Sequence, residues 1–454
     1  METASEVAKP AAKPSFFINR NFGLLWIGQA ISELGDVIYF VTLSLWIATI
    51  IAKGQSWAPA AVSGVMIATA LPSLLLGPVA GVFVDRWDKR RTMIRMDMLR
   101  ALLILLLIPL TGLVPLPFVS GPLPIFWQIG AIYAVVLAAS VCDQFFSPAR
   151  FTILSEILPE IHRARASAME QTSSSITKII GPFLAAPLLF VVGVQWALIV
   201  NALSFGVSFL AILAVRVPAD NKEQSQPAQR AGFFGEFKQG VRFYRESRVM
   251  LTLFISVLIV TLGTGALDAL LVFFFQVNLH APTSLFGMLP MAIGTGSVLG
   301  AILAALLVRR LGSARVFWLT LYLIGVLLIL FARQSSLWPA LILFLLTGLP
   351  LGAINTSLGP LLMHIIPHDL MGRVMSVAST GQTLCNVISV SLAGLLGSLL
   401  GGLHVNLLGI SFGTYDTIYV VTGLLFVLGA FYAMVNLRGL KISAEQNQGT
   451  SAIE

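Results

Sequence analysis

Long apolar runs dominate this 454-residue chain and restrict what it can fold into. Hydrophobic residues make up 57% of the sequence and charged residues only 11%, whereas soluble domains carry about 25% charged residues. A run of about 20 apolar residues spans a bilayer as a helix, and backbone groups in hydrocarbon must all pair within helices or closed barrels. The runs are continuous rather than alternating, which is typical of helices. The sequence therefore predicts an all-α membrane protein.

Twelve membrane-spanning helices are predicted from these runs. The first 15 residues contain no apolar segment of the signal-peptide type, so we expect the first helix to act as the insertion signal. The predicted spans are 20–51, 57–83, 93–115, 124–149, 165–192, 196–216, 249–277, 283–308, 314–333, 338–364, 373–400 and 414–437.

The distribution of positive charge predicts the orientation of the chain. Of the 28 Lys and Arg residues, only Lys53 and Arg333 fall on one side of the predicted membrane and Lys178 lies inside a span; the others fall on the second side. The positive-inside rule then places both termini in the cytoplasm, and we expect a multi-pass protein of the plasma (inner) membrane. This asymmetry, rather than nucleic-acid binding, accounts for the net charge of +8.

The predicted organisation is six helices, a polar linker and six more helices. We expect a cytoplasmic tail at 1–19, a six-helix bundle at 20–216, a linker at 217–248, a second bundle at 249–437 and a tail at 438–454. Within the linker, apolar residues recur at helical spacing between basic ones, which predicts an amphipathic helix on the cytoplasmic membrane surface. These apolar residues are Phe233, Phe234, Phe237, Val241 and Tyr244.

The two halves also share a short pattern. The fourth span leads into PEIHRARASA (159–168) and the tenth into PHDLMGRVMS (367–376), and Arg165 and Arg373 each stand six positions after the proline. Recurrence at the equivalent place in each half indicates parallel repeats, as in transporters built from two six-helix halves.

A dense charge cluster, GVFVDRWDKRR (81–91), lies between the second and third spans. It resembles the cytoplasmic loop 2–3 signature of the major facilitator superfamily, although Asp88 stands where that signature often has Gly. Together with the Pro-to-Arg elements and the long linker, it makes the chain similar to the macrolide-efflux and enterobactin-exporter branch over nearly its whole length. The resemblance implies two pseudo-symmetric six-helix bundles around a central cavity, alternating access and export driven by a proton gradient. GPFLAAP (181–187) resembles the Gly-Pro signature of superfamily antiporters, with Ala185 and Ala186 where glycines are usual.

The charge cluster also suggests a gate. Gly81 permits close helix packing, and Asp85 is placed to meet the positive N-terminal end of the eleventh span, near 372–373. Basic residues of the loop could pair with Asp97 or Glu156 and so hold the cytoplasmic side shut in an outward-facing state. The alternative is that these charges only fix topology. The predicted gating residues are Gly81, Asp85, Arg86, Arg90, Asp97, Arg165 and Arg373, with Lys89 and Arg91 as further candidates.

Charged residues inside the first span are the clearest functional signal. Gln29, Glu33 and Asp36 are spaced by four and three residues and therefore share one helical face. A charge at the bilayer centre costs at least ~2.5–3.5 kcal/mol. Two acids one turn apart in a low dielectric repel each other, so at least one is expected to bind a proton near neutral pH. That property suits proton coupling; the alternative is a structural hydrogen bond to a neighbouring helix.

Further polar residues lie within other spans. We expect Lys178 to need an acidic partner, Asp143 or Asp36, either as an exchangeable pair or as a static one, and Asp268 is a second candidate for coupling or substrate binding. The remaining candidate substrate-binding residues are Gln171 and Ser174 in the fifth span, Asn355 in the tenth, and Gln382 and Asn386 in the eleventh.

Enzymatic motifs are absent from the sequence. There is no G-x-x-x-x-G-K-[ST] phosphate loop and no H-E-x-x-H or C-x-x-C metal motif, and Cys142 and Cys385 both lie within spans. We therefore expect no enzymatic activity, no cofactor and no metal site.

The resulting functional prediction is a secondary active transporter. It would export an amphipathic organic compound, such as a macrolide-like drug, a siderophore or a related metabolite, by proton antiport. The expected partners are that small molecule, protons and lipid, without nucleic acid; a monomer is compatible with the sequence. Two alternatives stay open: a gradient-independent facilitator or lysophospholipid flippase, and a membrane sensor or scaffold.

Overall fold

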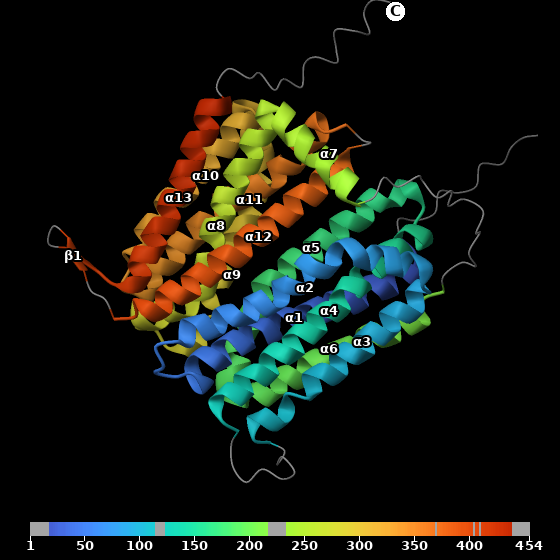
Figure 1. Ribbon diagram of the computed structural model, residues 1–454, viewed down its shortest axis with the longest axis horizontal. Coiled ribbons are helices and arrows are strands. Elements are labelled where there is room, and N and C mark those ends of the chain that lie inside the picture. Colours follow the sequence, from blue (N-terminus) through green and yellow to red (C-terminus); the bar gives the residue numbers. More distant parts are fainter. Residues whose placement is uncertain are drawn as a thin grey trace, which may run out of the picture.

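The computed structural model describes residues 18–113, 123–216, 233–367, 370–402, 405–407 and 410–437. The predicted tails at 1–17 and 438–454 and the linker residues 217–232 lie outside these residues. Helices make up nearly all of the described chain, and they form two bundles (Figure 1).

The N-terminal bundle contains six long helices. They are α1 (Arg20–Trp46), continued by the π-helical turn η1 (Ile47–Ile51); α2 (Ala58–Arg86); α3 (Lys89–Leu105), followed by the short 3-10 helix η2 (Ile108–Thr111); α4 (Ile125–Ile157); α5 (Glu160–Pro187), continued by η3 (Leu188–Val192); and α6 (Val194–Ala214).

The C-terminal bundle follows a shorter helix, α7 (Phe233–Glu246). Its elements are α8 (Arg248–Val277), the turn η4 (Thr283–Leu285), α9 (Met288–Leu311), α10 (Ser313–Ala332), α11 (Leu337–Ile365), α12 (Met371–Leu399) and α13 (Thr414–Leu437). Between α12 and α13, β1 (Val405–Leu407) and β2 (Ile410–Phe412) pair antiparallel, with Asn406 opposite Ser411. The sequence analysis did not predict this hairpin.

The twelve predicted spans correspond in order to the twelve long helices. Eleven of these, within the described residues, are long and apolar enough to cross a membrane, and α3 is the exception. It has only 17 residues and includes Arg95, Asp97 and Arg100. It nevertheless packs against α4 and α6 within the bundle, so the twelve-helix architecture is complete, although this helix ends well before the predicted residue 115.

Local signals set several helix starts. The Asn19 side chain accepts a hydrogen bond from the Phe22 amide (2.7 Å) and caps α1. Asp88 does the same for α3 by accepting from the Arg91 amide (2.7 Å). Such side chains replace the missing intrahelical acceptors at a helix N-terminus. The cap at Asp88 starts α3 directly after α2 ends, so the two helices meet within the charge cluster 81–91.

The two bundles contact each other mainly through α2 with α12 and α5 with α9, and α2 also contacts α8 (Figure 1). In the first pair, the Ala60 amide donates to Ser398 Oγ (3.1 Å), and a Cβ on Gly394 would lie 2.4 Å from Ser63 Oγ. In the second, a Cβ on Gly287 would lie 2.1 Å from the Pro182 carbonyl oxygen. Small residues therefore permit both close approaches.

One end of the molecule carries the basic segments 86–91 and 309–315, and we call it the basic end. The contacts between the bundles lie at the other end, which we call the opposite end. A single hydrophobic core at the opposite end joins the bundles and includes Leu43 and Trp46 from α1 and Phe274 from α8. At the basic end, separate cores belong to the N-terminal bundle and the C-terminal bundle. The bundles thus diverge toward the basic end (Figure 1).

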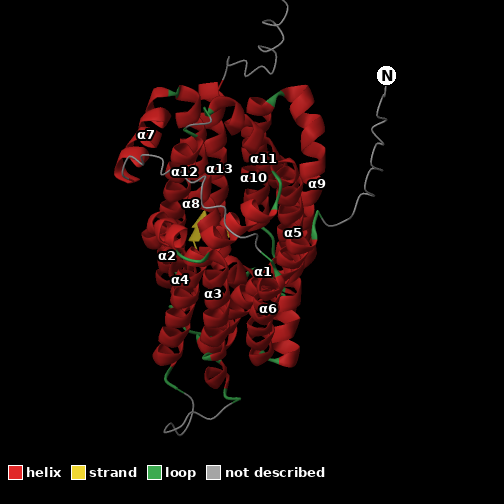
Figure 2. Ribbon diagram, turned by 90° about the vertical axis from the view of Figure 1, so that its right-hand side faces the viewer, coloured by secondary structure: helices red, strands yellow, loops and turns green. Residues whose placement is uncertain are grey.

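A helix, α7, occupies the segment predicted to be amphipathic and lies beside α12 (Figure 2). Its apolar residues contact protein: Phe237, Val241 and Tyr244 pack in a cluster with Val374 and Val377 of α12. The prediction that this face rests on the membrane surface is therefore wrong for these three residues, because α12 offers an apolar face of its own. The side chains of Phe233 and Phe234 lie outside the described part of the structure.

Candidate functional site

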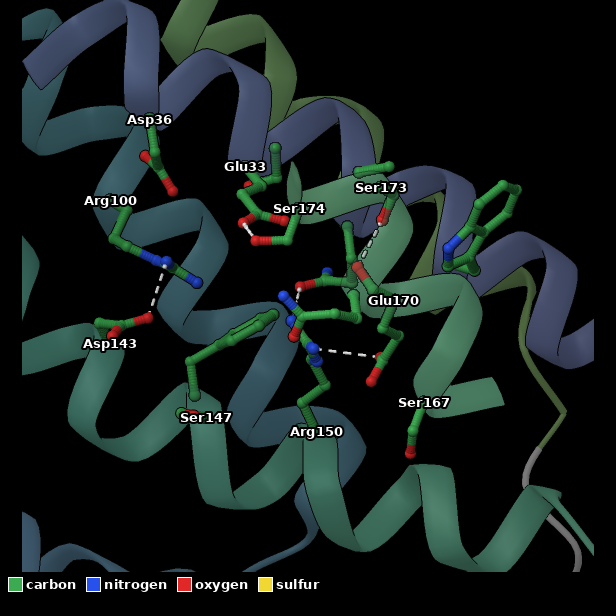
Figure 3. Close-up of a pocket in the computed structure, with 16 residues that line it drawn as sticks. Glu33, Asp36, Arg100, Asp143, Ser147, Arg150, Ser167, Glu170, Ser173 and Ser174 are labelled. Atoms are coloured by element: carbon green, nitrogen blue, oxygen red, sulfur yellow. Dashed lines mark hydrogen bonds and ion pairs between the residues drawn. The ribbon is translucent and has the colours of Figure 1, made fainter. Parts of the chain in front are cut away.

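A polar cavity of about 440 Å³ lies in the N-terminal bundle, between α1, α3, α4 and α5 (Figure 3). Six residues predicted from the sequence line it: Gln29, Glu33, Asp36, Asp143, Gln171 and Ser174. Trp26, Phe146, Arg100, Arg150 and Glu170 are among the other lining residues. The structure thus brings together predicted residues from three helices that are distant in the sequence.

The two acids of α1 have separate hydrogen-bond partners. Ser174 Oγ on α5 donates to Glu33 Oε1 (2.5 Å), whereas Asn201 Nδ2 on α6 donates to Asp36 Oδ1 (3.3 Å). Both carboxylates are half-buried. Buried carboxylates require such donors, so α5 and α6 fix the polar face of α1 on either side.

Arg100 of α3 is the principal residue that the sequence analysis missed. Its Nη2 lies 2.8 Å from Asp97 Oδ1, and its Nη1 lies 3.4 Å from Asp143 Oδ1. The guanidinium carbon also stands 4.3 Å from the ring centre of Phe146 and 4.7 Å from that of Phe205. A desolvated cation between two aromatic faces gains cation–π stabilisation. Arg100 is therefore held in place from several directions.

The three charged groups differ strongly in exposure. The Asp97 side chain is 0% exposed and that of Arg100 7%, whereas the Asp143 side chain is 52% exposed. Asp97 also accepts a hydrogen bond from Ser208 Oγ (2.6 Å). Asp143 is thus the member of this group that a proton or a ligand in the cavity can reach.

A continuous polar chain connects the cavity with this buried pair. Glu170 Oε1 pairs with Arg150 Nη2 (3.1 Å), and Arg150 Nη1 donates to Gln29 Oε1 (3.5 Å). Gln29 Nε2 in turn donates to Ser208 Oγ (2.7 Å), which donates to Asp97. Hydrogen-bonded networks of this kind transmit changes in charge between their members.

Lys178 does not make the predicted ion pair. Its side chain is exposed and pairs with no acid among the described residues. Arg100 takes the Asp143 partner instead. The signal was present in the sequence, because Arg100 stands 11 residues after Lys89, or about 17 Å along a helix. That depth places Arg100 within the helix, away from the membrane surface.

The predicted pairing of the 86–91 loop with Asp97 is also wrong, because Asp97 is buried inside the N-terminal bundle. Arg90 instead donates from Nε to the Ile212 carbonyl (3.2 Å) and from Nη2 to the Leu213 carbonyl (2.5 Å). Both carbonyls belong to the last turn of α6, whose acceptors lack intrahelical partners. Arg90 therefore fastens α6 to the start of α3.

The remaining gating candidates lie at the basic end. A Cβ on Gly81 or on Gly372 would meet open space, and the side chains of Asp85 and Arg86 are exposed. Arg373 Nη1 donates to Gln239 Oε1 of α7 (2.5 Å). Arg165, near the start of α5, lines a separate apolar groove. The bundles diverge at this end, so the latch between them stays a prediction for the outward-facing state.

The candidate residues of the C-terminal bundle lie apart from the polar cavity. Asn355 and Gln382 line a second, mainly apolar cavity of about 280 Å³ between α8, α11 and α12. Asp268 on α8 has an exposed side chain, and Asn386 on α12 lies beside Gly265 of α8. The predicted substrate-binding set is therefore divided between two bundles.

Comparison with known proteins identifies the family. The model of the Major Facilitator Superfamily matches residues 25–390. The MFS-type transporter YkuC of Bacillus subtilis is 24% identical over 394 residues, covering 84% of this chain and 86% of YkuC. The multidrug efflux pump Tap of Mycolicibacterium fortuitum is 26% identical, covering 76% and 83%. Macrolide efflux protein A of Streptococcus pyogenes is 20% identical, covering 84% and 91%.

Solved structures show the same fold. A bacterial homologue of the iron transporter ferroportin in its inward-facing state superposes with a TM-score of 0.70, at 17% identity, covering 92% of this chain and 99% of that chain. Its outward-facing state gives 0.61, at 18% identity and the same coverage. The nucleoside transporter NupG gives 0.68, at 12% identity, covering 92% and 100%. With the family model matching most of its length, this chain belongs to the Major Facilitator Superfamily and is a multi-pass membrane transporter.

Proposed function

We propose that this transporter exports an amphipathic organic compound from the cytoplasm in exchange for protons, by alternating access. The observation that carries the proposal is a polar cavity with several carboxylates at membrane depth, in a molecule whose bundles are sealed together at one end only. Ionisable groups at that depth are costly and normally serve a transport pathway.

The depth of the cavity supports a role in coupling. Asp36 stands 16 residues after Arg20, at the start of α1, which corresponds to about 24 Å along the helix. A carboxylate at that depth can bind and release a proton inside the membrane. Glu33 and Asp143 offer two further protonatable groups in the same cavity.

The direction of opening follows from the positive-inside rule. That rule assigns the basic end to the cytoplasm, so the described conformation would be inward-facing and ready to accept substrate from inside the cell. The better superposition on the inward-facing than on the outward-facing ferroportin homologue supports this assignment.

The asymmetry around Arg100 suggests how proton and substrate exchange. Protonation of Asp143, or binding of a ligand to it, breaks the longer of the two contacts of Arg100, at 3.4 Å. Arg100 remains bound to Asp97 at 2.8 Å. The exposed acid can therefore change partners without freeing a buried cation, which would be strongly unfavourable.

Two further points support export. Tap and macrolide efflux protein A are named as efflux proteins, and Trp26 and Phe146 provide apolar surface beside the cavity acids. In the outward-facing state we expect Asp85 to meet the N-terminal end of α12, as the sequence analysis proposed, and so to help close the cytoplasmic side.

Uphill transport in everted membrane vesicles tests this function. Vesicles containing the protein would be energised so that their lumen is more acidic than the medium, and radiolabelled erythromycin or another amphipathic drug would be supplied outside. We expect accumulation above that of vesicles without the protein, and its collapse on addition of an uncoupler. Accumulation that survives the uncoupler would support a gradient-independent facilitator instead.

A further inference from the structure

A further cavity lies at the opposite end of the molecule, between the two bundles, and we call it the seam pocket. It has a volume of about 560 Å³. The transport proposal uses none of its residues. Its lining includes Thr49, Lys53 and Phe190 from the N-terminal bundle and Gln276, His280 and Thr283 from the C-terminal bundle.

The seam pocket rests directly on the core that joins the bundles. Ala48, which lines the pocket, and Leu279, which precedes His280, are 5% and 4% exposed and belong to that core. The turn η4, which contains Thr283, contacts α5. Because the walls of the pocket come from both bundles, separation of the bundles at this end would pull them apart. The pocket therefore keeps its shape only while the opposite end is closed.

The charged groups of the seam pocket are basic. Lys53 and His280 are its titratable lining residues, both are exposed, and no acid is among the described residues that line it. Lys53 forms no ion pair with a described residue. Asp416, an acid at the same end, already accepts a hydrogen bond from Asn278 and lies 3.7 Å from Arg333 Nη1. A basic site without a compensating acid attracts anions.

His280 is held in an unusual backbone conformation. Its φ of 49° lies in the left-handed region, and within the described chain no other residue except glycine has a positive φ. Its Nδ1 lies 3.0 Å from the Asn278 carbonyl oxygen, which can only accept, so Nδ1 carries the hydrogen. Nε2 is therefore the nitrogen that can take up a proton and then donate to a ligand. A backbone conformation of this kind persists where its surroundings determine it.

We propose that the seam pocket binds a small organic anion and that the bound anion holds the two bundles closed at this end. Lys53 from one bundle and protonated His280 from the other contact the anionic group, and Phe190, which is 38% exposed, packs against the apolar part. The volume lies within the range of about 300–1,000 Å³ that is usual for small-molecule sites. Binding does not depend on the proposed export; its effect on conformation rests on the proposed alternating access.

Fluorine NMR with a probe anion tests the site. Full-length protein in nanodiscs of zwitterionic lipid would be titrated with para-fluorobenzenesulfonate. We expect Lys53→Gln to weaken binding about 5-fold, as the loss of one partly exposed ion pair does. Lys238→Gln, on the exposed side of α7, removes the same charge at the basic end and should leave the affinity unchanged. Equal affinity of Lys53→Gln and the unmodified protein would overturn the site.

The pH dependence of binding tests the role of His280. The charged groups around it are Lys53 in the pocket and Asp416 with Arg333 beside Asn278. Histidines in general gain charge between about pH 8 and about pH 5, whereas lysines, arginines, carboxylates and sulfonates keep theirs. The anion should therefore bind more tightly at about pH 5.5 than at about pH 8. His280→Asn, which tolerates a positive φ, should remove this difference; its persistence would exclude His280 from the site.

A buried cysteine reports whether the anion holds the bundles together. Ser63 on α2 is 2% exposed and faces Gly394 of α12, so Ser63→Cys, in a protein without Cys142 and Cys385, should react with maleimide only when the bundles separate. An anion that binds the closed state alone, at ten times its dissociation constant, should slow this reaction about 10-fold. Lys53→Gln should abolish the slowing. Equal rates with and without the anion would overturn the holding role.

The source of the anion is distinguished by adding phosphatidylglycerol to the nanodiscs. Displacement of the probe, dependent on Lys53, would assign the bound group to a lipid headgroup phosphate; an unchanged affinity would assign it to a free organic anion. Erythromycin accumulation in vesicles reports separately on export. Export together with binding that ignores Lys53→Gln would reject the seam pocket alone, and Lys53-dependent binding without export would reject the proposed function alone.

Discussion

At the scale of single residues, the site is organised around a buried arginine with unequal partners. Arg100 is close to Asp97, which is fully buried, and further from Asp143, which is half exposed. Its Nε has no hydrogen-bond partner among the described residues, so the guanidinium depends on these two acids and on the rings of Phe146 and Phe205. Removing one acid should therefore have a different consequence from removing the other.

We predict that Asp97→Asn lowers stability far more than Asp143→Asn. Loss of the Asp97 charge leaves a buried cation poorly compensated, which costs about 3 kcal/mol, whereas water in the cavity can replace the Asp143 contact. The measurement is thermal unfolding of the purified variants in one detergent. Similar melting temperatures for the two variants would argue against this division of roles.

A second prediction at this scale concerns Asp36. Asparagine can accept the same hydrogen bond from Asn201 as the aspartate does, but it has no carboxyl group that could bind and release a proton. We therefore expect Asp36→Asn to fold normally and to lose uphill drug accumulation in energised vesicles. Normal uphill efflux by this variant, with expression equal to that of the unmodified protein, would remove Asp36 from the coupling mechanism.

The limits of sequence reasoning are also clearest at single residues. The spacing of Gln29, Glu33 and Asp36 predicted their shared face correctly, because helical periodicity is local. The contacts of Arg100 with Asp143 and of Ser208 with Asp97 join positions 43 and 111 residues apart. No local pattern specifies such pairs, so the sequence predicted Asp143 only as one of two acids, with Asp36, that could pair with Lys178.

At the scale of helices, α7 acts as a brace on α12. Tyr244 Oη donates to the Val374 carbonyl (3.4 Å), and Arg373 donates to Gln239. Gly240 permits this close crossing, since a Cβ there would lie 2.6 Å from the Arg373 carbonyl oxygen. The N-terminal end of α12, which the proposed latch requires, is therefore positioned by the helix that follows the linker.

We predict that Gly240→Ala destabilises the protein by about 1–3 kcal/mol, as overpacking does. Gly206→Ala is the matched control, because a Cβ on Gly206 in α6 would meet open space, and alanine in an open helical position is favourable by about 0.5–1 kcal/mol. Thermal unfolding should move in opposite directions for the two variants. A Gly240→Ala protein as stable as Gly206→Ala would show that α7 is not held tightly.

Hydropathy predicted the helices well where lipid is their main solvent, and less well at α3. The predicted span 93–115 included the apolar residues after position 100, but the helix starts at Lys89 and ends at Leu105. It directs Asp97 and Arg100 into the bundle, whereas Arg91 and Arg95 are exposed. Packing between α4 and α6 compensates for its polar composition. That compensation depends on tertiary contacts, which a hydropathy profile does not contain.

At the scale of the whole molecule, one core joins the bundles and the basic end is open. The repeat pattern at 159–168 and 367–376 predicted two related halves, and the charge distribution predicted their common orientation. Which end of the bundles is closed could not be predicted, because both ends contain small residues and the difference in free energy between the two states is expected to be small.

We predict that widening the closed end shifts the molecule toward its outward-facing state. Gly394→Leu places a side chain where Ser63 and Ala60 already lie, and separation of the bundles relieves that clash without unfolding either one. A cysteine introduced at Ser147, in the polar cavity, should react about 10-fold more slowly with an impermeant maleimide from the basic side.

The background for this experiment lacks Cys142 and Cys385, which are the two native cysteines, and Gly206→Leu serves as a control away from the contact. Unchanged labelling in a stable Gly394→Leu protein would indicate that the α2–α12 contact does not set the conformational equilibrium.

The most direct test of the central claim is proton flux through the purified protein in liposomes. A pH gradient would be imposed across the liposome membrane, and amphipathic cations and macrolides would be added one at a time. Antiport predicts that a transported compound releases protons down their gradient, and that Asp36→Asn abolishes this release. Transport of such a compound with no accompanying proton movement in the unmodified protein would contradict the proposed coupling.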